Sequence, residues 1–289
     1  MVIVKLTGGL GNQMFQYATA RRLAEKNSTI LKLDVNGFES YKLHKYSLHC
    51  FLIREYLATK AEVDLLSMSR KKRYWDASKI SFRKMGENTT LKEKHFHFDP
   101  EVLRARDDLY LDGFWQTEKY FSDIRDVLCR EFTIKYPQDA LSSELSNRIR
   151  SMESVSIHIR RADYVENKVT NEFHGVCTLD YYKRCVELIV SKTVSPHFFV
   201  FSDDPQWAKE NLTIGRGMTV VDHNDASRNF EDLRLMSQCK HNIIANSSFS
   251  WWGAWLNENS GKIVCAPKKW FRDDATDTRD VIPENWITV

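Results

Sequence analysis

The alternation of short apolar runs with amphipathic stretches after residue 150 constrains the fold more than any other feature. Apolar runs of strand length occupy residues 155–159, 198–202, 218–222, 242–245 and 262–265. Stretches with helical spacing separate them, at residues 179–190, 205–211, 230–239 and 249–257. Strands that alternate with helices in this way are typical of a parallel sheet with crossover helices. This half is therefore predicted to be a doubly wound α/β lobe.

The first half opens in the same manner. A glycine-rich turn connects an apolar strand to an amphipathic helix, and further strands and a helix follow; the predicted elements are residues 2–6, 13–26, 29–34, 108–113 and 120–132. The periodicity between residues 35 and 105 is less clear. We expect a second Rossmann-like α/β lobe.

The boundary between the lobes is predicted in residues 135–151. This stretch is polar, holds a proline and several Ser and Asp residues, and has little hydrophobic periodicity. The expected domains are residues 1–150 and 151–289, and 42% hydrophobic residues allow each to bury a core.

Composition excludes several classes of protein. The 42 Lys and Arg residues nearly balance 39 Asp and Glu residues, so neither a nucleic acid nor a membrane surface is an expected partner. No window approaches the roughly 20 apolar residues of a membrane span. The amino terminus has the pattern of a strand rather than a signal peptide, and the six cysteines form no CxxC pair. We expect a cytoplasmic enzyme with reduced thiols and no integral membrane segment.

Polar side chains gather where the strand 155–159 ends. Alternation along the strand places His158 and Arg160 on one face, and Arg161 and Asp163 follow. Open α/β sheets bind ligands at this end, and the planar guanidinium group matches phosphate oxygens. Arg160 is therefore the first candidate phosphate ligand. An alternative is that Arg160 or Arg161 pairs with Asp163 only to fix the loop.

A second candidate anion site follows the strand 242–245. Ser247 or Ser248 is predicted to cap a helix whose free N–H groups, including that of Phe249, could receive a diphosphate. Simple helix capping by serine explains the same residues equally well. The tryptophans Trp251, Trp252 and Trp255 are more typical of packing than of sugar binding. Two anion sites in one lobe favour the phosphate interpretation.

The turn after the first strand invites comparison with dinucleotide-binding loops. The G-x-G-x-x-G pattern fails, because a third glycine would fall at Met14. Gly9 and Gly11 instead allow a ligand to approach the backbone closely, while Asn12 and Gln13 supply neutral donors and acceptors. A tight strand-to-helix turn is the competing interpretation. The failed pattern argues against a nucleotide-cofactor oxidoreductase.

Two carboxylates, Asp203 and Asp204, end the strand 198–202. They could accept hydrogen bonds from a base or ribose, or cap the helix that begins with Pro205. No third ligand stands at a useful spacing for a metal, and two arginines can neutralise a diphosphate without Mg²⁺. No metal or other cofactor is predicted.

These segments together resemble the α-1,2-fucosyltransferase family of inverting glycosyltransferases, in its compact bacterial form. The resemblance covers nearly the whole chain. It depends on four motifs in order, GGLGNQMFQYA from Gly8, HIRRADY from His158, FSDD from Phe201, and NSSFSWWGAW from Asn246. One departure is Ala162, where relatives often carry glycine.

The resemblance implies a GT-B fold, in which two lobes face a cleft. GDP-β-L-fucose would bind the C-terminal lobe, and a galactose-terminated oligosaccharide would face the N-terminal lobe. By this likeness Arg160 holds the β-phosphate, His158 lies near the guanine and Asp163 orients the arginines. Ser247 and Ser248 would meet phosphate, and Asn12 would lie near the reacting fucose.

The implied reaction moves L-fucose to the 2-hydroxyl of a terminal galactose with inversion. The general base is not identified: Glu166, Asp34 and the pyrophosphate itself all stay open. Transfer of another GDP-sugar, another linkage, and a non-catalytic carbohydrate-binding or nucleotide-binding protein are the remaining alternatives. The natural acceptor is not indicated by the sequence, and a homo-oligomer is left open.

Overall fold

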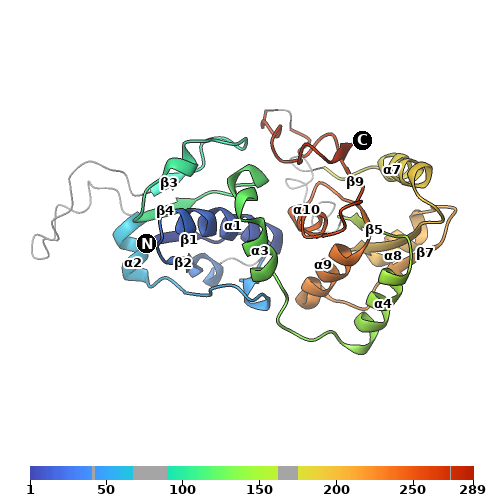
Figure 1. The fold of residues 1–289 in the computed structure, drawn as a ribbon, viewed down its shortest axis with the longest axis horizontal. Helices are drawn as coiled ribbons and strands as arrows, with labels where there is room; N and C mark the ends of the chain where they lie inside the picture. Colours follow the sequence, from blue (N-terminus) through green and yellow to red (C-terminus); the bar gives the residue numbers. More distant parts are fainter. Residues whose placement is uncertain (41–42, 68–89, 162–174, 274) are drawn as a thin grey trace, which may run out of the picture. The chain divides into compact units, whose positions relative to one another are not determined.

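The chain forms two compact units, Met1–Thr133 and Ile134–Val289. A computed structural model describes residues 1–289 except 41–42, 68–89, 162–174 and 274. Each unit contains one parallel sheet with helices packed on it (Figure 1). The predicted α/β class with two lobes is therefore confirmed for both halves of the chain.

The sheet of the first unit has the strand order β2-β1-β4-β3, with every neighbouring pair parallel. The central strand β1, Val2–Lys5, is almost completely buried. The helix α1, Leu10–Lys26, crosses from β1 to β2 and buries an apolar face that includes Met14, Phe15 and Leu23. The other elements of this unit are β2 (Leu31–Asp34), α2 (Lys60–Ser67), β3 (Thr90–Lys92), β4 (Leu109–Asp112) and α3 (Arg125–Glu131).

The helix predicted at residues 120–132 is shorter than expected. Two 3-10 turns, Glu118–Tyr120 and Ser122–Ile124, precede α3. The aromatic side chains of Tyr120 and Phe121 are both buried. The chain therefore turns more tightly before α3 than a regular α-helix does.

The second unit has the sheet order β10-β9-β8-β5-β6-β7, again parallel throughout. Its central strand β5, Ser154–Ile159, is buried at every position. The predicted alternation is confirmed with small shifts at the ends: α7 (Leu179–Lys192), β6 (His197–Ser202), α8 (Pro205–Asn211), β7 (Met218–Val221), α9 (Asn229–Gln238), β8 (His241–Ile243), α10 (Ser248–Trp255), β9 (Val264–Ala266) and β10 (Ile287–Thr288).

The division between the units falls before the predicted boundary. Residues 140–151 form α4, Ala140–Ser151, which belongs to the second unit and packs against α9. The buried stripe of α4 is Ser142, Leu145, Ser146 and Ile149, at helical spacing. Because serine fills half of these positions, hydrophobic periodicity alone did not reveal the helix.

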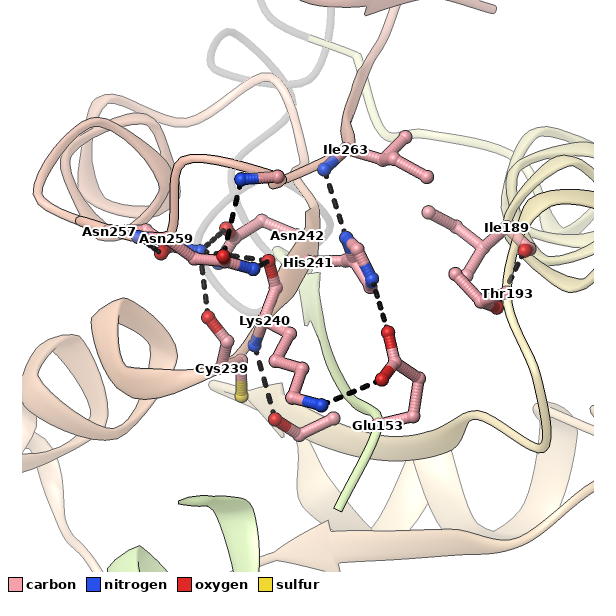
Figure 2. Close-up of polar contacts among 12 residues, drawn as sticks. Glu153, Ile189, Thr193, Cys239, Lys240, His241, Asn242, Asn257, Asn259 and Ile263 are labelled. Atoms are coloured by element: carbon pink, nitrogen blue, oxygen red, sulfur yellow. Dashed lines mark hydrogen bonds and ion pairs between the residues drawn. The ribbon is translucent and has the colours of Figure 1, made fainter. Parts of the chain in front are cut away.

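The amino ends of β5 and β8 are joined by a polar network (Figure 2). The Glu153 carboxylate accepts hydrogen bonds from His241 Nε2 at 2.8 Å and Lys240 Nζ at 2.7 Å. His241 Nδ1 accepts from the Ile263 N–H at 2.9 Å, so the imidazole carries its proton on Nε2. These groups satisfy one another and connect strands, which identifies the network as framework.

Two further features concern the cysteines and the helices. All six cysteines are free thiols, and Cys50, Cys185, Cys239 and Cys265 are buried. None of the described helices combines the length and apolar character needed to cross a bilayer.

Candidate functional site

The carboxyl ends of β5, β6 and β8 bring the candidate donor residues of the second unit to one edge of its sheet. β5 lies between β6 and β8, and Ile159 pairs in register with Ser202. Because the three strands are parallel, the loops that follow them leave the sheet at the same edge. These loops carry Arg160 and Arg161, Asp203 and Asp204, and Ser247.

Among the described residues, Asp203 helps to orient Arg160 and the backbone of Arg161. Its Oδ2 lies 3.2 Å from Arg160 Nη1, and its Oδ1 accepts the Arg161 backbone N–H at 2.8 Å. The sequence assigned this role to Asp163, which lies outside the described residues, as does Glu166. The Arg160 side chain stays 27% exposed, so the carboxylate holds it in place without removing it from solvent.

The Arg161 side chain is held by an aromatic ring. Its guanidinium carbon lies 3.8 Å from the centre of the Trp207 ring, a cation–π contact. Its Nε lies 4.0 Å from Asp204 Oδ2. Trp207 was not singled out in the sequence, because an aromatic residue in a short helix has no local signal for this function.

Asp204 caps α8. Its side chain accepts a hydrogen bond from the Trp207 N–H at 3.1 Å, and Pro205 occupies the first turn. The capping interpretation of Asp204 is thus confirmed. A direct contact of Asp203 or Asp204 with a nucleoside remains a prediction.

His158 is buried beside the arginines. The residue is 4% exposed, and its ring centre lies 5.5 Å from that of Phe249. Burial, with a smaller contribution from the Arg160 charge, lowers the pKa of His158 to about 3. The imidazole is therefore neutral near pH 7, and its Nδ1 has no hydrogen-bond partner among the described residues. A buried polar atom without a partner is available to a ligand group.

The start of α10 provides the second half of this edge. Ser247 is the N-cap residue, but its hydroxyl makes no capping hydrogen bond. Ser248 and Phe249 form the first turn and are half-buried. Helix N–H groups without a side-chain cap, together with the positive end of the helix dipole, favour an anion at this position.

The neighbouring Asn246 was not assigned a role from the sequence. Its Nδ2 donates to the carbonyl oxygens of Gly175 and Trp270, both at 3.2 Å. It therefore anchors the chain immediately before the helix start and fixes where the α10 N–H groups point.

The tryptophans of α10 pack in the core. Trp251 and Trp252 are completely buried, with ring centres 5.1 Å apart, and Trp251 also contacts Trp286 at 5.4 Å. The Trp251 indole N–H donates to the Val281 carbonyl oxygen at 2.8 Å. The packing interpretation of this cluster is confirmed.

The structure confirms one prediction for the glycine-rich turn of the first unit and leaves another untested. Gly8 adopts a positive φ of 75°, Gly9 is the N-cap residue of α1, and Gly11 is buried inside the helix. Asn12 Oδ1 accepts a hydrogen bond from Gln116 Nε2 at 2.9 Å. The tight-turn interpretation is confirmed, and the ligand contacts predicted for Gly9, Gly11 and Asn12 stay predictions.

Gln13 does not point outward as the sequence suggested. It is fully buried, its Nε2 donates to the carbonyl oxygens of Gly8 and Lys45, and its Oε1 accepts the Ser47 N–H. Its amide therefore connects two loops, and both of its N–H groups are used within the unit.

Asp34, one of the candidate bases, is also part of the framework. It is 6% exposed and accepts hydrogen bonds from the Tyr110 hydroxyl and Asn36 Nδ2, both at 2.7 Å. Both carboxylate oxygens are thus engaged within the first unit.

The edge of the second unit is suited to bind a diphosphate. Two guanidinium groups follow β5 and a helix start follows β8, and both favour an anion, while Asp203 and Asp204 offset part of the guanidinium charge. Independence from metals stays a prediction, to be tested with a chelator.

Comparison with known proteins points to one family. The model of the family described as "Glycosyl transferase family 11" matches residues 1–289. The chain is 35% identical to an alpha-1,2-colitosyltransferase of Escherichia coli, covering 100% of this chain and 99% of the relative. It is 32% identical to the O-antigen biosynthesis glycosyltransferase WbnK of the same species, over 98% of this chain and 99% of the relative. A galactoside alpha-(1,2)-fucosyltransferase 2 of Sus scrofa is 27% identical over 89% of this chain and 69% of the relative.

Solved structures agree on the fold. A mutant of Arabidopsis thaliana FUT1 in complex with GDP aligns over 98% of this chain and 74% of its own, with a TM-score of 0.54 and 12% identity. NodZ alpha-1,6-fucosyltransferase soaked with GDP-fucose aligns over 88% of this chain and 92% of its own, with a TM-score of 0.51 and 16% identity. At such identities the likeness concerns the fold alone, and it confirms the GT-B type.

Proposed function

Because the chain belongs to glycosyl transferase family 11, we propose that it transfers L-fucose from GDP-β-L-fucose to the 2-hydroxyl of a terminal galactose. That it is a glycosyltransferase follows from its family and its relatives. The observation that carries the donor proposal is the edge of the second unit, where Asp203 holds Arg160 and Arg161 beside the uncapped start of α10.

This edge supplies the electrostatic part of the reaction. The acceptor oxygen bonds to the anomeric carbon while the bond from that carbon to the β-phosphate oxygen breaks, and the electron pair leaves with GDP. Negative charge therefore grows on the diphosphate as the reaction proceeds. Arg160 and the N–H groups of Ser248 and Phe249 bind that growing charge more strongly than the bound donor, which lowers the barrier.

The proposal also covers the remaining donor contacts. The neutral, buried His158 has an unused ring nitrogen and lies close to Phe249, consistent with a place beside the guanine. Displacement in a single step gives an α-linked product from the β-linked donor. The proton of the acceptor hydroxyl leaves to a carboxylate or to the departing diphosphate, and no described residue is assigned as the base.

A second donor is favoured by one observation. The relative with 35% identity over the whole chain is named as a colitosyltransferase, whereas the fucosyltransferase of Sus scrofa is 27% identical. GDP-colitose is therefore the competing donor. The same diphosphate site serves both sugars, so the choice depends on groups that contact the sugar ring.

A donor panel tests the proposal. The protein is incubated with GDP-fucose, GDP-colitose, GDP-mannose or UDP-galactose and with galactose-terminated acceptors, in the presence and absence of EDTA. We expect GDP release from GDP-fucose, an α-1,2 linkage by NMR, and no loss of rate with EDTA. Preferred use of another donor would replace the fucosyl assignment, and binding without turnover would indicate a non-catalytic protein. Cell fractionation tests the cytoplasmic location that belongs to this proposal.

A further inference from the structure

The carboxyl edge of the first unit's sheet carries a second group of residues with unused binding capacity. The segment Gly113–Gln116, here called the β4 loop, follows β4 directly. Gln16 of α1 connects it to the end of β1, because its Nε2 donates to the Gly113 carbonyl oxygen at 3.2 Å and its Oε1 accepts the Thr7 N–H at 3.0 Å. The loop is therefore fixed to the sheet and to the glycine-rich turn.

The β4 loop is held in a conformation that bulky residues avoid. Trp115 has a φ of 59°, in the left-handed region, although it is not glycine. Such a residue costs of the order of 1–3 kcal/mol and persists only where its surroundings impose it, often at binding sites. This backbone geometry is the first sign that the loop has a function beyond connection.

Glu93 imposes that conformation. Its two carboxylate oxygens accept the N–H groups of Phe114 at 2.7 Å and Trp115 at 2.9 Å. Burial raises the pKa of Glu93, while these two hydrogen bonds oppose the change. The Trp115 indole packs against Gly113. A Cβ atom at position 113 would lie 2.8 Å from the indole ring, so the loop needs glycine there.

The loop ends in an amide whose oxygen is not used. Gln116 is 7% exposed, and its Nε2 donates to Asn12 Oδ1 at 2.9 Å. Its Oε1 is buried and accepts no hydrogen bond from the residues that the structure describes. A buried acceptor left in this state costs about 1–3 kcal/mol, so a ligand hydroxyl at this position would recover that free energy.

An exposed aromatic ring accompanies this amide. Phe114 is 40% exposed, two residues before Gln116, in a loop that is otherwise buried at Trp115 and Gln116. An aromatic face beside neutral amide groups matches the two sides of a pyranose, which has apolar C–H faces and hydroxyl groups on its rim. The one carboxylate that holds the loop, Glu93, already accepts two backbone N–H groups, so the binding capacity described here is that of neutral groups.

We propose that the β4 loop, together with Asn12, forms the acceptor-sugar subsite of the enzyme. Phe114 packs against the C–H face of the terminal sugar, and Gln116 Oε1 accepts a hydrogen bond from one of its hydroxyl groups. Glu93 acts as a positioning residue that holds the loop. The identity of the sugar as galactose rests on the proposed function, whereas the subsite itself rests on the contacts above.

Binding of lactose, a galactoside that needs no donor, tests the subsite. Saturation-transfer NMR is recorded with the wild-type protein, Phe114→Ala, Gln116→Leu and the control Tyr56→Ala. Tyr56 is also an exposed aromatic residue of the first unit, but its backbone pairs with β2, which β1 separates from β4. Thermal unfolding checks that each variant is folded, and calorimetry gives its affinity for GDP.

We expect lactose affinity to fall about tenfold or more in Phe114→Ala and Gln116→Leu, equivalent to about 1.4 kcal/mol. GDP affinity should stay within about twofold, and Tyr56→Ala should bind both ligands like the wild type. Equal lactose binding by all four proteins, or none by the wild type, would overturn the subsite. Absence of GDP binding by the wild type would instead remove the proposed donor, and the lactose comparison would still stand.

Discussion

The two sheets present different chemistry at the same topological position. At the carboxyl edge of the second unit the side chains are charged, with Arg160 and Arg161 held by Asp203. At that edge of the first unit the polar groups near α1 are mainly neutral amides, among them Asn12 and Gln116. On the two proposals above, one fold element serves two kinds of recognition, an anion in one unit and uncharged hydroxyl groups in the other.

The largest effect is expected at the charged edge. Arg160→Ala removes a cation that stabilises the departing diphosphate, so turnover should fall by about 100-fold or more, equivalent to roughly 3 kcal/mol. Steady-state kinetics with saturating donor measure it. The matched control is Arg184→Ala, an exposed arginine of the second unit that forms an ion pair with Asp180 of its own helix. Near-normal turnover in Arg160→Ala would refute the assignment.

The buried side-chain amide of Gln13 should affect the stability of the protein rather than ligand binding. Gln13→Ala leaves the carbonyl oxygens of Gly8 and Lys45 and the Ser47 N–H without their buried partner. We expect a loss of about 2–3 kcal/mol in the free energy of unfolding, measured by urea denaturation. A variant as stable as the wild type would show that this amide is not the connection described here.

His158 predicts how stability depends on pH. Its folded pKa of about 3 lies below that of an unfolded histidine, near 6.5, so the unfolded state binds a proton first as pH falls. The contribution of neutral His158 to the free energy of unfolding is complete above about pH 6.5 and is lost toward pH 3. Over this range the free energy of unfolding should fall by up to about 1.4 kcal/mol per pH unit. Urea denaturation of wild type and His158→Gln across this range isolates the contribution. Parallel curves for the two proteins would contradict it.

The smallest expected effects distinguish the roles of the adjacent carboxylates Asp203 and Asp204. Asp204→Ala removes the cap of α8 and should cost about 1 kcal/mol of stability with little change in turnover. Asp203→Ala should instead lower turnover, because Arg160 loses the group that orients it. Melting temperatures and rates measured on both variants provide the check. If the two exchanged these phenotypes, the division of roles would be wrong.

Sequence reasoning located the second unit better than the first. Strands such as β5 and β6 are continuous apolar runs in the middle of a parallel sheet, and such runs are visible without a structure. The helix α4 was missed because Ser142 and Ser146 fill half of its buried stripe. The short strand β3 has too few residues to show any period.

The site was predicted as a set of residues but not as a set of contacts. Arg160, His158 and Ser247 lie at one sheet edge, and their roles stay predictions. The contact between Arg160 and Asp203, a residue distant in the chain, was not predicted. The β4 loop was not recognised at all. Its signals are the positive φ of Trp115 and the unused oxygen of Gln116, and both exist only in three dimensions.

A crystal structure with bound GDP tests the contrast between the two edges most directly. The account predicts the β-phosphate within hydrogen-bonding distance of the Arg160 guanidinium and of the N–H groups at the start of α10. A diphosphate bound instead at the glycine-rich turn of the first unit, with no contact to Arg160, would contradict it.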